Sequence, residues 1–106
     1  MDEKKVLDII EAARETGKIR KGVNEATKSI ERGEAKLVIA AGDVNPPEIV
    51  MHLPMLCDEK KIAFVKVSKK LDLGRAAGID VGTAAVAIAD AGEGKNDLKK
   101  LLESNE

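Results

Sequence analysis

The chain has 106 residues, and we expect residues 1–106 to form one domain with a single core. Hydrophobic residues make up 43% and charged residues 35%, but Phe64 is the only aromatic side chain. Single-stranded nucleic acid is usually bound by stacking bases on aromatic faces, so this composition excludes a general single-strand binder. Cys57 and His52 are each alone, which excludes an intrachain disulfide and a Cys/His zinc cluster.

Helical and extended patterns alternate through the first half of the chain. Apolar residues at helical spacing predict a helix over residues 3–16, which Gly17 ends. A short extended segment over residues 18–21 precedes Gly22, and a second helix is expected from Val23 to about Arg32. The continuous apolar run over residues 35–41 predicts a strand that is buried on both faces.

The same alternation continues to the end of the chain. Pro46-Pro47 opens a third helix, which Pro54 is expected to kink or interrupt. Its inward side chains are expected to be Ile49, Val50, Leu53, Leu56 and Cys57. Residues 63–67 and 83–89 predict strands on either side of a short helix over residues 69–77, and Leu98, Leu101 and Leu102 mark a last helix. This order predicts an α/β fold, a three-layer α/β/α sandwich around a four-stranded mixed sheet.

Positive charge is concentrated in two segments, although the net charge is −1. Residues 14–36 carry seven Lys and Arg against four Glu, and residues 63–80 carry four basic residues against two acidic ones. A fold that joined these segments would have one basic face, although blocks of this size also arise as ordinary solvated charge. No apolar run approaches the ~20 residues that span a bilayer, and the charged start differs from a signal peptide, so we expect a cytoplasmic protein without a membrane anchor.

The second helix holds the first candidate site. Asn24, Glu25 and Lys28 are three or four residues apart and share one polar face. An amide, a carboxylate and an ammonium can together recognise an RNA base pair, provided that the RNA is distorted enough to open its deep groove. Gly22 permits close approach of the backbone, and a helix N-terminus favours phosphate. The alternative is structural, with Asn24 as the N-cap and Glu25–Lys28 as an ordinary surface ion pair.

The loop between Gly78 and Gly82 is the second candidate. Ile79 and Val81 could be exposed there and cover an unstacked base, or both could anchor the loop to the core. Elsewhere structural roles are favoured: His52 lies among apolar neighbours, and Cys57 is a small buried hydrophobe. Because no nucleophile–base pair and no phosphate-binding glycine motif is present, we expect no enzyme, no cofactor and no metal site.

The sequence resembles a known family. The segments that carry the resemblance are Lys18–Lys28, Ile30–Gly33, Pro47–Ile49, His52–Cys57, Leu73–Gly78 and Ile79–Val81, in this order. Together they resemble the L7Ae family, the archaeal kink-turn-binding protein of the large ribosomal subunit, whose eukaryotic relatives occur in small nucleolar and spliceosomal particles. The resemblance spans roughly residues 4–92 and implies the same α/β/α sandwich.

The resemblance also implies a target and its contacts. The target is the kink-turn, an RNA internal loop with tandem sheared G·A pairs. By the resemblance, the bases would be recognised by Asn24, Glu25 and Lys28, and the RNA backbone would be contacted by Lys21, Gly22 and Arg32. The bases would be covered by Ile79, Asp80 and Val81. An extruded nucleotide would be held by Ile49 and Lys70. Two positions differ from the family pattern. Asn45 stands where members usually have Asp or Glu, and Gly82 stands where many members have proline.

The implied partners are ribosomal RNA and the guide RNAs of box C/D and H/ACA particles, with ribonuclease P RNA as a further candidate. In guide particles the protein would nucleate assembly of the other core proteins, and without RNA we expect a monomer. One alternative is an L30e-type protein that binds ribosomal RNA only. Another is a protein-interaction module that has the same fold but has lost RNA binding.

Overall fold

The computed structural model describes residues 2–104 of the chain. The elements, in chain order, are α1 (Glu3–Thr16), β1 (Lys18–Lys21), α2 (Val23–Glu31), β2 (Leu37–Ala41), α3 (Glu48–Lys60), β3 (Ala63–Val67), α4 (Lys70–Ala76), β4 (Ala85–Asp90), the 3₁₀ turn η1 (Gly92–Gly94) and α5 (Lys95–Ser104). The predicted alternation is confirmed, with strands β2 and β4 beginning slightly later than expected. The sequence pattern did not predict η1.

The strands form one mixed sheet in the order β1-β4-β2-β3. Strand β4 lies antiparallel to both β1 and β2, and β2 lies parallel to β3. Strands β1, β2 and β3 therefore end at the same side of the sheet, where β4 begins. Helices α2, α3 and α4 all start there, and the carboxyl ends of neighbouring strands commonly hold binding sites in α/β proteins.

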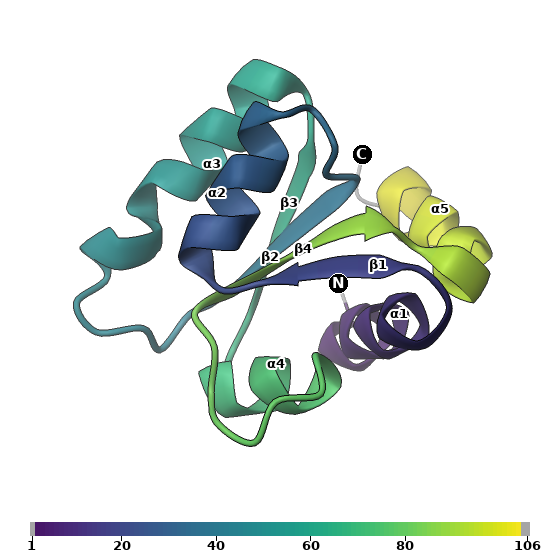
Figure 1. Ribbon diagram of the computed structural model, residues 1–106, viewed down its shortest axis with the longest axis horizontal. Coiled ribbons are helices and arrows are strands. Elements are labelled where there is room, and N and C mark those ends of the chain that lie inside the picture. The colour runs from purple at the N-terminus through teal and green to yellow at the C-terminus, as the bar shows by residue number, and fades with distance from the viewer. Residues whose placement is uncertain (1, 105–106) are drawn as a thin grey trace.

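Helices cover both faces of the sheet (Figure 1). Along β2, Leu37, Ile39 and Ala41 pack in the core with α1, α4 and α5, whereas Val38 and Ala40 pack in the core with α2 and α3. All residues of β2 are buried, which explains the continuous apolar run in the sequence. The predicted three-layer sandwich around a four-stranded mixed sheet is thus confirmed.

Small strand residues lie beneath α2 and α3. Ala40, Ala85 and Ala87 are fully buried there, and they face Ile30 of α2 and Leu53 of α3 in the same core. Short side chains on the strands allow the two helices to lie close to the sheet and side by side (Figure 1). The sheet therefore fixes where the first turns of both helices lie.

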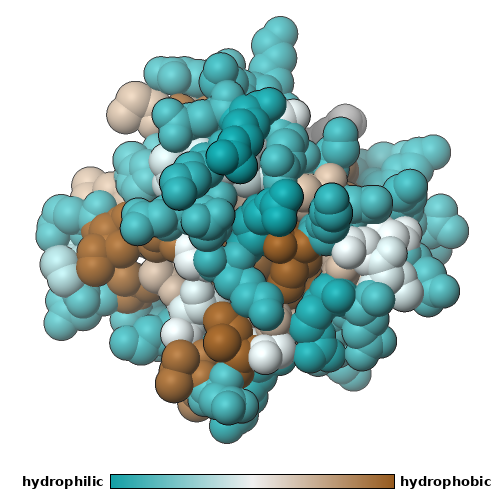
Figure 2. All heavy atoms as spheres, in the orientation of Figure 1, coloured by the Kyte–Doolittle hydropathy of each residue, from teal (hydrophilic) through white to brown (hydrophobic). Residues whose placement is uncertain are grey.

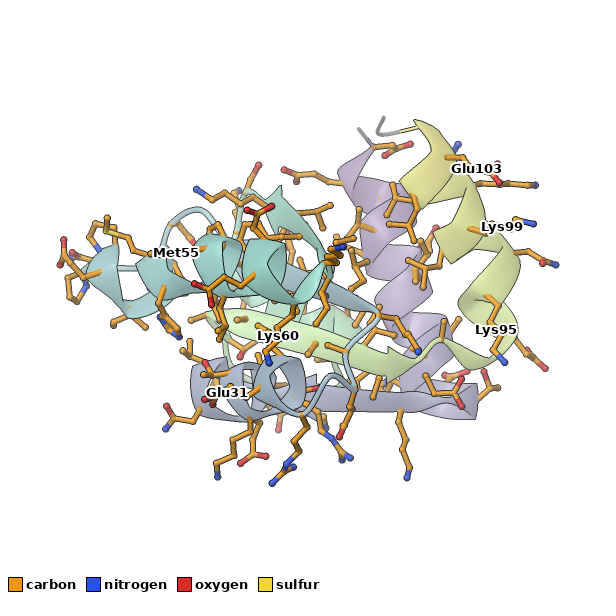
Figure 3. The ribbon with its side chains drawn as sticks, turned by 90° about the horizontal axis from the view of Figure 1, so that it is seen from above. Glu31, Met55, Lys60, Lys95, Lys99 and Glu103 are labelled. Carbon is orange, nitrogen blue, oxygen red and sulfur yellow. The ribbon has the colours of Figure 1, made fainter. Side chains whose placement is uncertain are left out.

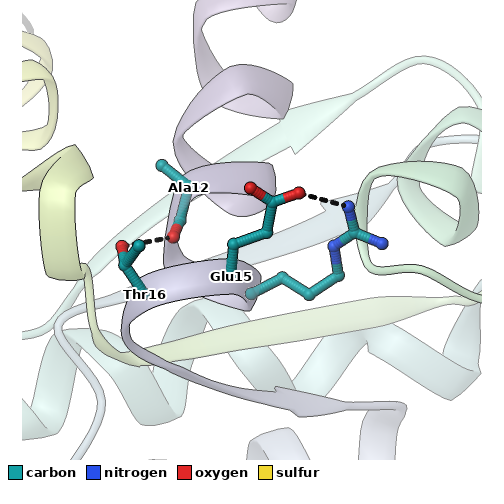
Figure 4. A network of polar contacts seen from close by, with 4 residues as sticks. Ala12, Glu15 and Thr16 are labelled. Carbon is teal, nitrogen blue, oxygen red and sulfur yellow. Dashed lines mark hydrogen bonds and ion pairs between the residues drawn. The ribbon is translucent and has the colours of Figure 1, made fainter.

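The C-terminus of α1 is tied to η1 by Thr16. Its hydroxyl donates a 2.8 Å hydrogen bond to the Ala12 carbonyl and accepts one of 2.9 Å from the Glu93 backbone N–H. Close by, the Arg14 guanidinium lies 3.3 Å from the Glu15 carboxylate (Figure 4). These contacts hold η1, and with it the start of α5, against the end of α1.

Two expectations about α3 are wrong in part. Helix α3 runs through Pro54 without interruption, because burial of Val50, Leu53 and Cys57 on the sheet offsets the hydrogen bond that proline lacks. Ile49 does not point fully inward but is 42% exposed. Within residues 2–104, no helix is long and apolar enough to cross a membrane.

Candidate nucleic-acid interface

Gly22 joins β1 directly to α2. Its backbone has φ +93° and ψ 159°, a conformation that side-chain-bearing L-residues rarely adopt. Its N–H donates a 2.8 Å hydrogen bond to the Ala85 carbonyl, and its own carbonyl accepts one of 2.9 Å from the Ala26 N–H. These bonds fix the turn, so the first turn of α2 is held at the end of the sheet.

The polar face of α2 points to solvent. Asn24, Glu25 and Lys28 are all exposed, and the Lys28 ammonium lies 3.4 Å from the Glu25 carboxylate. The predicted ion pair is therefore present, but both side chains are about half exposed, so it contributes at most about 1 kcal/mol. Such a weak pair can be exchanged for contacts to a ligand.

Asn24 does not cap the helix. The N-cap position is Gly22, and Asn24 is the second residue of α2, so the structural alternative for this side chain is wrong. Its amide has no hydrogen bond to any part of the chain that the structure describes. Asn24 thus presents a free donor and a free acceptor beside Glu25.

A groove of about 640 Å³ runs along the start of α2. Its lining residues are Lys21, Gly22, Val23, Asn24 and Glu25 from the β1–α2 segment, with Ile49 and His52 from α3. The structure therefore brings together five of the predicted positions, which are Lys21, Gly22, Asn24, Glu25 and Ile49. The groove has charged and amide groups on one wall and an exposed aliphatic side chain on the other.

Val23 and His52 are the two lining residues that were not predicted for the site, and His52 is the polar one. It is exposed, and its Nε2 lies 2.9 Å from the Thr27 hydroxyl of α2. The Thr27 hydroxyl donates its one proton to the Val23 carbonyl at 2.7 Å, so His52 Nε2–H is the donor in this contact. Spacing could have indicated this position, because His52 follows Ile49 by three residues and shares its side of α3.

Lys70 and the loop after α4 lie at the same end of the sheet. The Lys70 N–H donates a 2.8 Å hydrogen bond to the Asp43 carboxylate, which lies in the loop between β2 and α3. The Lys70 carbonyl accepts a 3.1 Å bond from the Thr83 N–H, and the Ile79 N–H donates a 2.9 Å bond to the Gly74 carbonyl. These bonds attach the loop to α4 at both ends. The loop is therefore attached even though Gly82 stands in it instead of a proline.

The two apolar residues of this loop have different surroundings. Ile79 is partly buried and packs against the core, whereas Val81 is 66% exposed and Asp80 is also exposed. Ile79 therefore anchors the loop to the core, whereas Val81 has the exposure that cover of an unstacked base would require. Figure 2 shows hydrophobic surface at the left and lower left of the molecule, where Figure 1 places the start of α3 and this loop.

Arg32 lies apart from the groove. It follows α2 and lies ten residues after Gly22, which places it about 15 Å away along the helix. There the Arg20 guanidinium lies 2.7 Å from the Glu34 carboxylate and holds the pKa of Glu34 below its ordinary value, with Arg32 and Lys18 lowering it further. Arg32 therefore lies at the end of α2 away from the groove, whereas Arg20 directly precedes Lys21 of the groove in β1.

Comparison with known proteins identifies the family. Residues 4–98 match the sequence profile of the Ribosomal protein L7Ae/L30e/S12e/Gadd45 family. The chain belongs to this family. Its fold is also similar to a solved structure described as the Giardia lamblia 15.5kD RNA binding protein, with a TM-score of 0.91 and 33% sequence identity over 96% of this chain and 85% of that one.

Membership confirms the resemblance that the sequence showed. It supports a non-enzymatic RNA-binding protein of the ribosomal and ribonucleoprotein class. The family match covers α1 through the start of α5, so all elements around the groove lie inside it.

Proposed function

We propose that this protein binds RNA in the groove between α2 and α3 and recognises the kink-turn. The observation that carries the proposal is the exposed Asn24–Glu25 pair in the first turn of α2, which lines a groove together with Lys21 and Gly22. The family resemblance assigns base recognition to these same positions.

The groups on α2 suit a sheared G·A pair. The Asn24 amide can donate and accept at once, the Glu25 carboxylate accepts from exocyclic amines, and the Lys28 ammonium donates to base acceptors. In regular A-form RNA the deep major groove is too narrow for side chains, so these contacts require a bent RNA with an opened groove. Base recognition by α2 therefore selects for the kinked state.

The start of α2 also suits the RNA backbone. Because Gly22 has no side chain, no cap covers the outward N–H groups of the first turn. These groups and the positive end of the helix dipole favour a phosphate, and the exposed Lys21 adds a positive charge beside them. Arg32 would contact the backbone only where the RNA continues along α2.

The opposite side of the site would hold the bases that the kink displaces. Ile49 is 42% exposed at the groove and Val81 is 66% exposed in the loop, so both can cover an unstacked base. Lys70 and Asp80 supply charged groups near them, and Ile79 anchors the loop to the core. The protein would stabilise the kink-turn because it binds the bent state more tightly than the extended one.

The proposed RNAs are ribosomal RNA and the guide RNAs of box C/D and H/ACA particles, with ribonuclease P RNA as a further candidate. In guide particles the bound protein would provide the platform on which other core proteins assemble, and the chemistry of modification would belong to those partners. The protein would act in the cytoplasm and would be a monomer before it binds RNA.

A gel-shift titration tests the site. The double variant Asn24→Ala, Glu25→Ala is expected to bind a kink-turn hairpin at least about 30-fold more weakly, since each base contact contributes about 1–3 kcal/mol. The matched control is Asn96→Ala, Asp97→Ala, which changes the second and third residues of α5 instead of those of α2. Equal affinity of the two double variants would rule out base recognition by α2.

The same titration separates the alternatives. An L30e-type protein, which the matched family also includes, would shift ribosomal kink-turns but not isolated box C/D or H/ACA guide RNAs. A protein-interaction module would shift none of these RNAs. Binding to guide RNAs that depends on Asn24 is the outcome that the proposal requires.

A further inference from the structure

A second groove lies at the opposite end of the sheet from the proposed RNA site. It has a volume of about 620 Å³, within the usual size of binding sites. Its lining residues are Lys36, Ala89, Asp90, Ala91, Lys95, Leu98, Lys99, Leu102 and Glu103. This is where β4 ends and β2 begins, whereas α2, α3 and α4 start at the other end.

The floor of this groove is apolar and its rim is charged. Ala91 and Leu98 are buried in the core, and Leu102 leaves 37% of its surface exposed beside them. Along α5, Lys95, Lys99 and Glu103 follow one another at intervals of four residues, which places them on one side of the helix (Figure 3). That side lies across the molecule from α3 and Met55, so the groove is remote from the proposed RNA site.

The positive groups on the rim have no partner within the described residues. No ion pair involves Lys36, Lys95 or Lys99 there, although the chain as a whole has a net charge of −1. Of the two acidic residues, Asp90 already accepts a 2.9 Å hydrogen bond from the Gly92 N–H. The lining therefore carries three ammonium groups against two carboxylates, a net positive charge, beside the partly exposed Leu102.

We propose that this groove binds an acidic amphipathic helix of a partner protein. Apolar side chains of the partner would cover Leu102, and its carboxylates would face the ammonium groups of Lys36, Lys95 and Lys99. A basic residue near one end would face Glu103. The stretch of α5 from Lys95 to Glu103 is about 12 Å long, enough for two to three turns of a partner helix.

The apolar floor decides between this partner and nucleic acid. An RNA backbone would face the lysines but would leave Leu102 uncovered, whereas an amphipathic helix would both face the lysines and cover Leu102. The family match ends at residue 98, so Lys99, Leu102 and Glu103 lie beyond the region that defines the family. The inference does not depend on RNA binding, because the two grooves lie at opposite ends of the sheet.

The probe for the test is a fluorescein-labelled helical peptide of about 14 residues, composed of Leu and Glu with all Leu on one face. The full chain is titrated with it, and anisotropy and backbone amide NMR shifts are followed. We expect saturable binding with shifts confined to the groove residues. A peptide of the same composition without an apolar face, and one with Lys in place of Glu, should not bind.

Charge reversal locates the contact. Lys95→Glu with Lys99→Glu is expected to weaken peptide binding at least about tenfold. The matched control is Lys5→Glu with Lys100→Glu, which changes net charge equally at exposed positions outside the groove and should leave affinity unchanged. All four lysines are exposed, so both variants should fold, and circular dichroism melting checks this.

The peptide should bind equally well to the chain saturated with kink-turn RNA. The proposal is overturned if the peptide does not bind, or if reversal at Lys95 and Lys99 has no more effect than the control. It is equally overturned if RNA or phosphatidylglycerol vesicles, rather than the peptide, shift the groove amides. Such a result would leave the RNA site on α2 untouched, since that site is tested by Asn24 and Glu25.

Discussion

Replacing Gly22 by alanine would test how the turn before α2 is held. The residue has φ +93° and ψ 159°, a region that is essentially restricted to glycine. No atom lies within 4 Å of an added Cβ, so neighbours do not oppose the methyl group. The backbone itself opposes it, because the bonds to Ala85 and Ala26 hold the residue from both sides.

The expected cost follows from this conformation. A side-chain-bearing residue forced into this region loses about 1–3 kcal/mol of stability. For a domain of this size, that loss lowers Tm by roughly 4–20 °C. Gly33 provides the comparison, because it also has positive φ, +71°, and open space around an added Cβ, but it lies at the far end of α2. Gly33→Ala is expected to cost about 1–2 kcal/mol.

The assays are urea denaturation for stability and gel shift for RNA affinity, both at a temperature where each variant is folded. Both variants should lose stability with an unchanged m-value, but only Gly22→Ala should weaken kink-turn binding, because only its methyl group enters the groove. Wild-type stability of Gly22→Ala would show that the turn relaxes freely and would refute the argument that these two hydrogen bonds fix it.

Three further predictions concern single side chains. His52→Ala should weaken kink-turn binding about two- to tenfold by gel shift, since it removes a groove contact worth about one hydrogen bond; unchanged affinity would exclude His52 from the interface. Burial raises the pKa of the Cys57 thiol to about 11, so iodoacetamide at pH 8 should label the native chain at least about 100-fold more slowly than the unfolded chain. The Arg20 guanidinium holds the pKa of Glu34 below its ordinary 4.5. The Arg20–Glu34 pair therefore stabilises the folded chain above pH 4.5, and this stabilisation is lost as the pH falls through the lowered pKa of Glu34. NMR titration of Arg20→Gln should show the pKa of Glu34 returning toward 4.5, and a value that stays low would exclude Arg20 as the cause.

The fold was predictable because its strongest sequence signals agree with the packing. The apolar run at residues 35–41 predicted a strand covered on both faces, and β2 within it is such a strand. Gly17 and Gly22 bound the short β1 strand as expected. The α2 face was predictable for the same reason, since spacing alone places Asn24, Glu25 and Lys28 on one side of a helix.

Features that depend on tertiary packing were not predictable in this way. Asn24 is of a residue type that favours N-caps, but the N-cap is Gly22, two residues earlier, and the Asn24 amide is left in solvent. Pro54 signals a break, yet burial of the surrounding helix keeps α3 continuous. His52 seemed structural among apolar neighbours, because only the packing of α3 against α2 brings its ring to Thr27 and the groove.

The strand order has a consequence for how the protein behaves before it meets a partner. The open edges of the sheet are β1 and β3, and an unpaired edge can recruit a strand from another molecule. Strand β1 is only four residues long and has an exposed lysine at each end, Lys18 and Lys21, while β3 exposes Lys66. A second copy approaching either edge would bring like charges together, so we expect these edges to resist fibril-like association even at high protein concentration.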